Sequence, residues 1–168
     1  MNAAQRRSQI LQLLRESRRP LSASALAGGL GVSRQIIVGD VALLRAAGAD
    51  ITATPRGYVI LSPSGLVRRV AVRHPPDQME QELTLMVDQG CTVLDVMVEH
   101  PVYGQLTGRL DLSSRHDVAE FTRRVADSRS QPLAALTDGI HLHTLSCPDE
   151  AAWQRVRQAL EQAGFLLT

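Results

Sequence analysis

Residues 22–48 read SASALAGGLGVSRQIIVGDVALLRAAG, which predicts two helices joined by a tight turn. Ser22 and Ser33 each precede an apolar stretch of helical spacing, where N-cap residues stand. Gly31 lies between the two helices, at a position that favours a left-handed residue. The second helix has a core stripe at intervals of four and three residues: Ile37, Val41 and Leu44. Two short helices linked in this way form a helix-turn-helix unit.

The flanking segments extend this unit into a domain. Residues 8–15 carry apolar side chains at helical spacing, and this first helix ends before Pro20. Residues 51–54 and 57–61 read as two short strands. Arg56 stands at the tip of the hairpin between them. The hairpin therefore predicts a wing that brings a cation to the DNA backbone or the minor groove.

The charge of the chain changes sign along its length, although the net charge is only +1. Residues 1–61 hold eight arginines and three acidic residues, whereas the remainder holds ten arginines and fourteen acidic residues. A basic segment of this kind is typical of a module that binds a polyanion. The turn-forming cluster Ser62-Pro63-Ser64-Gly65 marks the change. We therefore predict a DNA-binding domain over residues 1–61 and a second domain over residues 66–168.

Side chains off the core stripe of the second helix are candidates for DNA contact. In a helix-turn-helix unit the N-terminal residues of this helix face base edges in the major groove. Arginine pairs with guanine or phosphate, glutamine with adenine, and valine contacts the methyl group of thymine. The predicted set is Ser33 as the cap, Arg34, Gln35, Val38 and, on the wing, Arg56. The expected partner is operator double-stranded DNA, and symmetric operators suit a homodimer.

Strands and helices alternate in the second domain. The predicted strands are 66–73, 92–99, 105–112 and 140–145, with a further edge strand at 165–167. The predicted helices are 76–89, 114–127 and 148–163. This order indicates the α+β class: a winged helix-turn-helix followed by an α/β sandwich domain, in which helices cover a largely antiparallel sheet.

Histidines of the second domain are candidate metal ligands. His141 and His143 alternate on one strand, so both imidazoles point to the same face. Such a pair is either a metal clasp or two histidines on an exposed sheet face. His74 ends the first strand of the domain, and Glu80 and Glu82 follow in the next helix. Helical periodicity puts these two carboxylates on opposite margins of the inward face and does not choose between them.

Residues 10–61 resemble the winged helix of the biotin-repressor type, through the Gly-Val-Ser-Arg-Gln turn, Leu-Arg-x-x-Gly and the Arg-Gly-Tyr wing. Gly39 departs from the pattern, since glycine inside a helix costs about 1 kcal/mol relative to alanine. It either lets the helix approach DNA closely or is simply tolerated. In the second domain, His74 with the acid that follows it, His100-Pro101-Val102-Tyr103-Gly104 and His141-Leu142-His143-Thr144 resemble the three-histidine domain. The combination resembles the niacin-responsive repressors of NAD-biosynthesis and niacin-uptake genes.

The resemblance implies a cofactor and an effector. It implies a divalent transition metal, held by a set of four ligands: His74, Glu82, His141 and His143. Three imidazoles and one carboxylate suit zinc or nickel rather than magnesium or calcium. The implied co-repressor is nicotinate, whose pyridine nitrogen is a ligand for such metals. The candidates for binding this effector are Arg73, Tyr103 and His100, the last as a pocket wall or as a hydrogen-bond partner of a ligand.

Two other functions remain as alternatives. A metal centre of this type activates water in some enzymes, and Glu80 or Asp77 would then be the base. The sequence has no G-x-S-x-G, Walker or zinc-protease motif, so we predict a regulator and no enzyme. The other alternative is a regulator that responds to the metal itself. Two distant cysteines, no apolar run of membrane-spanning length and no export signal predict a cytoplasmic protein without a membrane partner.

Overall fold

The structure is a computed structural model that describes residues 1–60 and 65–168. The chain divides into two compact units, Met1–Ser62 and Pro63–Thr168. The predicted linker residues 62–64 and the last residue of the predicted wing, Leu61, lie outside the described residues. Within the described ranges no single helix is long and apolar enough to cross a membrane, while one bent pair, Ala23–Leu30 with Arg34–Ala46, meets that test by length and composition alone.

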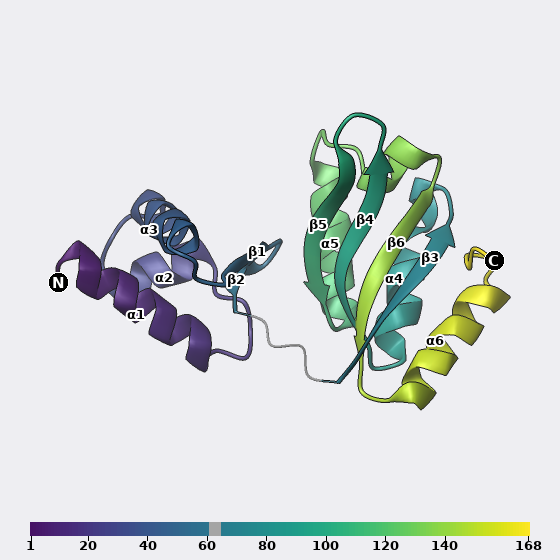
Figure 1. The fold of residues 1–168 in the computed structure, drawn as a ribbon, viewed down its shortest axis with the longest axis horizontal. Helices are drawn as coiled ribbons and strands as arrows, with labels where there is room; N and C mark the ends of the chain where they lie inside the picture. Colours follow the sequence, from purple (N-terminus) through teal and green to yellow (C-terminus); the bar gives the residue numbers. More distant parts are fainter. Residues whose placement is uncertain (61–64) are drawn as a thin grey trace. The chain divides into compact units, whose positions relative to one another are not determined.

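The first unit is a winged helix-turn-helix, as predicted (Figure 1). Its elements are α1 (Ala3–Glu16), α2 (Ala23–Leu30), α3 (Arg34–Ala46), β1 (Thr52–Thr54) and β2 (Gly57–Val59). Ser22 and Ser33 cap α2 and α3 through their hydroxyl oxygens, and Gly31 ends α2 with a φ of 67°. Helix α1 begins five residues before the predicted start, because Asn2 and Gln5 form a capping box there.

The core of the first unit confirms the predicted stripe of α3 and adds a buried acid. Ile37, Val41 and Leu44 are all buried. Asp40 is buried on the same helix, where its carboxylate lies 2.5 Å from Nε of Arg6 and 3.5 Å from Nη1 of Arg7. Two arginines of the basic segment therefore hold α1 against α3.

The second unit is an α+β domain with a wholly antiparallel sheet. The strands are β3 (Leu66–Arg73), β4 (Thr92–His100), β5 (Gly104–Leu112) and β6 (Ile140–Cys147), in the order β3-β6-β4-β5. The helices are α4 (Met79–Asp88), α5 (Arg115–Asp127) and α6 (Glu150–Gln162), with short 3-10 helices at Pro76–Gln78 and Leu133–Thr137. The predicted edge strand at 165–167 reduces to a single bridge between Leu166 and Val72. Its backbone still bonds to β3, because the amide of Arg73 donates to the carbonyl of Phe165 at 2.9 Å.

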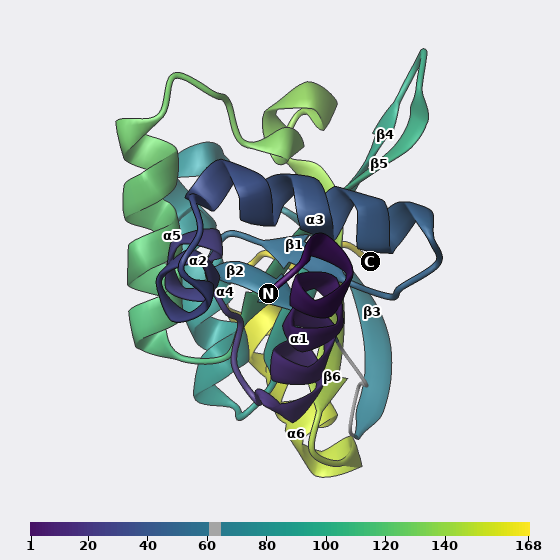
Figure 2. The ribbon, with the colours of Figure 1, turned by 90° about the vertical axis from the view of Figure 1, so that its left-hand side faces the viewer.

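The core of the second unit lies between one face of the sheet and the three helices. Figure 2 shows α4 and α5 on one side of the sheet. Buried side chains from β3, β4, β5, β6 and all three helices form one cluster. Strand β6 runs in the interior of the sheet, where Val70 of β3 and Val96 of β4 both pair with His143. Two histidines of β6 therefore enter the core from the middle of the sheet.

Candidate metal centre and nucleic-acid interface

Four side chains meet in this core: His74, Glu82, His141 and His143, called the cluster below. His141 and His143 reach it from β6, and His74 comes directly after β3. Glu82 enters from α4 and is fully buried, whereas Glu80 on the same helix is exposed. The structure thus makes the choice between the two carboxylates that periodicity left open.

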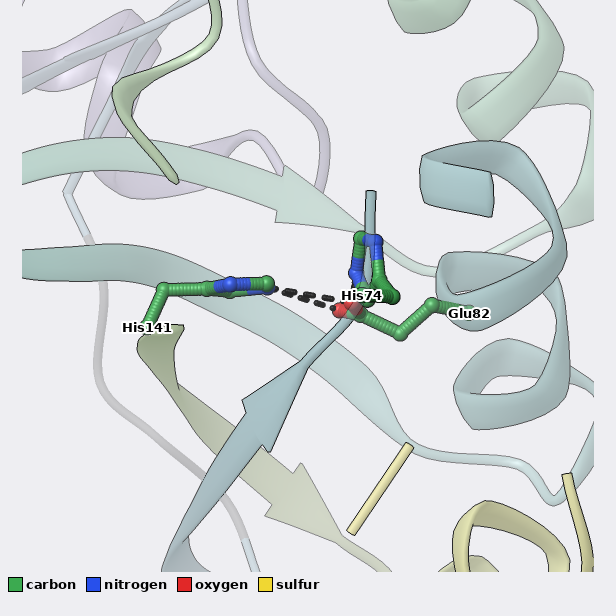
Figure 3. Close-up of side chains that lie close together, drawn as sticks. All are labelled: His74, Glu82 and His141. Carbon is green, nitrogen blue, oxygen red and sulfur yellow. Dashed lines mark hydrogen bonds and ion pairs between the residues drawn. The ribbon is translucent and has the colours of Figure 1, made fainter. Parts of the chain in front are cut away.

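The imidazoles of the cluster converge on one carboxylate. Nε2 of His141 lies 3.0 Å from Oε2 of Glu82, and Nε2 of His143 lies 2.5 Å from Oε1. Nε2 of His74 is also in direct contact with Oε2. Figure 3 shows His74 and His141 around the end of the Glu82 side chain. Ligand atoms of His74, Glu82 and His141 all lie within 4.8 Å of one another, while His143 adjoins the other carboxylate oxygen.

Hydrogen bonds on the far side of each ring fix the protons. Every Nδ1 of the cluster lies near a backbone carbonyl: Pro75 for His74 at 2.8 Å, Gly139 for His141 at 2.8 Å and Asp95 for His143 at 2.7 Å. A carbonyl oxygen only accepts, so Nδ1 carries the hydrogen and a neutral ring presents a lone pair at Nε2. When all three rings are neutral, three nitrogen lone pairs face a carboxylate, an arrangement that a bound cation would stabilise. Carbonyl-anchored imidazoles of this kind are typical of metal ligands.

The electrostatics of the cluster favour an ionised carboxylate. Burial by itself raises the pKa of Glu82; when His143 and His141 are protonated, their charge and hydrogen bonds outweigh burial and lower this pKa to about 2. Burial likewise lowers the pKa of His143, while the charge of Glu82 raises it by more. At neutral pH the core therefore holds a carboxylate anion. With this carboxylate as the oxygen donor and the three imidazoles as nitrogen donors, the set fits zinc or nickel.

Gly139 sets the position of two cluster residues. A Cβ atom at Gly139 would lie 2.5 Å from the carbonyl oxygen of His74, and the φ of Gly139 is 84°. Its own carbonyl accepts the hydrogen bond from Nδ1 of His141. Only glycine lets the turn before β6 approach His74 this closely without strain.

We expect Gly139→Ala to weaken the fold around the cluster and, with it, any metal binding by the cluster. The added methyl must displace His74 and the carbonyl that orients His141, and such partners of metal ligands are worth about 10–100-fold in metal affinity. Chelator competition on the purified variant measures this loss. The matched control is Gly104→Ala, because Gly104 has a similar φ of 73° but no atom within 4 Å of an added Cβ. Equal metal affinity in the two variants would contradict the assigned role.

A cavity of about 540 Å³ adjoins the cluster at His74. Its lining includes Arg73, His74, Gln78, Gly139 and Phe165. Arg73 forms an ion pair with Asp138 at 2.7 Å on this surface.

The other two predicted effector-binding residues lie on the hairpin between β4 and β5, not among the lining residues of this cavity. Nδ1 of His100 accepts hydrogen bonds from the amides of Val102 and Tyr103, and Tyr103 is 75% exposed. The structure therefore brings Arg73 close to the cluster, and it does not bring His100 and Tyr103 together with Arg73.

The predicted DNA-contacting residues lie at the cap and in the first two turns of α3, and on the wing. Ser33 caps α3, and Arg34 and Gln35 are exposed. Val38 is half-buried and packs against the core of the first unit. Arg56 stands in the turn between β1 and β2, where it is half-buried.

Comparison with known proteins agrees with both units. Residues 67–168 match the 3H domain family, and residues 6–59 match an HTH domain family. The chain belongs to the 3H-domain family. It is 43% identical to the "Probable transcription repressor NiaR" of Thermotoga maritima over 164 residues, which cover 97% of this chain and 94% of that protein. It is 44% identical to the "Transcription repressor NadR" of Bacillus subtilis over 169 residues, with coverage of 98% and 94%.

This 3H-domain protein is therefore a DNA-binding transcription repressor, in line with the predicted regulator and against the enzyme alternative.

Sequence reasoning missed the residues that orient the imidazoles of the cluster. The sequence marks Thr137-Asp138-Gly139 as a turn before the strand, but not that the carbonyl of Gly139 meets Nδ1 of His141. No sequence signal marks the carbonyls of Pro75 and Asp95, since these depend on the folded backbone.

Proposed function

We propose that this repressor holds a divalent transition metal, zinc or nickel, in the cluster and uses nicotinate as its co-repressor. The observation that carries the metal is the convergence of three carbonyl-anchored imidazoles on the ionised carboxylate of Glu82. All four residues serve as ligands in this proposal. The metal, when bound, supplies a positive charge at the carboxylate and joins β3, α4 and β6.

The proposal for nicotinate rests on the resemblance and on the chemistry beside the cluster. Nicotinate is a small, flat anion, and the cavity at His74 exceeds the size that it needs. Arg73 offers a cation for its carboxylate, which would share this guanidinium with Asp138, and Phe165 offers an aromatic side chain. His100 and Tyr103 remain second candidates for the carboxylate. Because nicotinamide has no negative charge, a site of this kind prefers nicotinate.

The two units have different functions in this proposal. Residues 1–61 bind operator DNA, and residues 66–168 form the regulatory domain. One recognition helix reads only a short half-site, so the protein acts as a homodimer on a two-fold operator. Its place of action is the cytoplasm, where the operator lies.

Substitutions in the first unit test the DNA-binding residues. Gln35→Ala is expected to cost about 1–3 kcal/mol of operator binding and to relax one base preference, because a bidentate base contact is lost. Arg56→Ala is expected to weaken binding to all DNA sequences by a similar factor. It is also expected to reduce the slope of log affinity against log salt concentration by about one. Fluorescence anisotropy at several salt concentrations measures both effects. Arg123→Ala, an exposed arginine of the second unit, is the control. Parent-like binding by both variants would refute this recognition surface.

One observation favours a second candidate, a repressor that responds to the metal itself. Side chains of the cluster are at most 4% exposed, and His74 alone among them lines the cavity. A site this enclosed suits an ion better than an organic molecule. Full operator binding with metal alone, unchanged by nicotinate, would favour this candidate.

A further inference from the structure

Two β-branched side chains flank the core stripe of α3, and they differ in exposure. Ile36 and Val38 lie about 100° to either side of Ile37. Val38 packs against the core of the first unit, whereas Ile36 is 42% exposed. The apolar side chain that α3 presents beside Gln35 is therefore that of Ile36.

The position of Ile36 suits direct base recognition. It lies in the first turn of α3, and its amide donates to Oγ of the capping residue Ser33 at 3.3 Å. The N-terminal turn of a recognition helix is the part that faces base edges. An isoleucine on a helix has one strongly preferred rotamer, so its methyl groups are oriented before DNA binds.

We infer that Ile36 is a specificity-determining residue that contacts the C5-methyl group of a thymine in the operator. Arg34 and Gln35 offer polar groups to the same groove, and Ile36 adds an apolar surface next to them. Thymine is the base that presents a methyl group in the major groove. Contact removes that methyl and the isoleucine side chain from water together. Val38 is half-buried against the core of the first unit, so Ile36 is the more exposed of the two for this role.

Deoxyuridine tests the contact, because it differs from thymidine only by the missing methyl. The probe is an operator duplex selected from a random library by the full-length protein, with each thymine replaced in turn. One replacement is expected to weaken binding by the parent about fourfold, the value for one buried methyl. Ile36→Ala is expected to weaken binding to the thymine duplex by about fourfold or more, because at least one buried methyl contact is lost. For this variant, the ratio of its affinities for the thymine and uracil duplexes at that position (the ratio below) is expected to be close to one.

Three further variants separate this contact from a structural effect. Ile36→Val keeps the branched side chain and is expected to keep the ratio. Leu43→Ala removes another exposed apolar side chain, two turns further along α3, and Val38→Ala trims the core; both are expected to keep the ratio. Thermal unfolding verifies that each variant is folded. A ratio that persists in Ile36→Ala, a ratio lost in Val38→Ala, or an operator insensitive to every replacement would overturn the inference.

Discussion

Glu82→Gln is expected to empty the metal centre. Glutamine keeps the size of the side chain but removes the negative charge on which three imidazoles converge. Its amide can donate to one Nε2 lone pair, so the fold should survive without metal. Because partners of metal ligands are already worth about 10–100-fold, we expect losing a ligand to cost more than 100-fold in affinity. Elemental analysis and chelator competition measure the loss.

The control for this experiment lies on the same helix. Glu80→Gln makes the same chemical change at an exposed position two residues earlier and should leave the metal content at that of the parent. The double substitution of His141 and His143 by alanine should also release the metal. Full occupancy in that double variant, or equal loss in Glu80→Gln and Glu82→Gln, would show that the metal is bound elsewhere.

Nicotinate is expected to tighten operator binding by the metal-loaded repressor by about 5–150-fold, the usual range of allosteric coupling. A ligand shifts a conformational equilibrium only through its different affinities for the two states. Operator DNA must therefore tighten nicotinate binding by the same factor. Anisotropy with labelled operator gives the first factor, and calorimetry of nicotinate with and without operator gives the second. Nicotinamide serves as the uncharged control.

Two outcomes would change the account of the effector. Unequal factors in the two experiments would show that the protein is not in a single linked equilibrium. Operator affinity that ignores nicotinate, while the metal remains necessary, would assign the effector role to the metal.

Local signals in the sequence were sufficient to predict the helices of the first unit and the core stripe of α3. Serine caps, the Gly31 break and the stripe of α3 are features of neighbouring residues, and the structure confirms them. Asp40 is one of the three acidic residues in residues 1–61, and no local pattern marks it as buried, because its partners Arg6 and Arg7 are more than thirty positions away. Tertiary contacts of this kind leave no periodic mark.

Helical periodicity also cannot decide which of two nearby residues on a helix is buried by tertiary packing. Helical angles treat Ile36 and Val38 alike, and they leave Glu80 and Glu82 on opposite margins of one face. Packing decides both cases: α1 and the wing complete a core that takes in Val38, and the sheet brings the two histidines of β6 to Glu82. Alternation on the strand predicted that His141 and His143 share a face. It did not predict which face, because that depends on the register with β3 and β4.

Calorimetry of nicotinate with metal-loaded and metal-stripped protein tests the central claim most directly, since the claim joins the effector to the cluster. Far-ultraviolet circular dichroism of the stripped protein verifies that the fold persists. Because the pyridine nitrogen of nicotinate is a ligand for transition metals, we expect binding to the loaded protein, markedly weaker binding to the stripped protein, and recovery when zinc or nickel is returned. Equal nicotinate affinity in the loaded and stripped proteins would contradict the account.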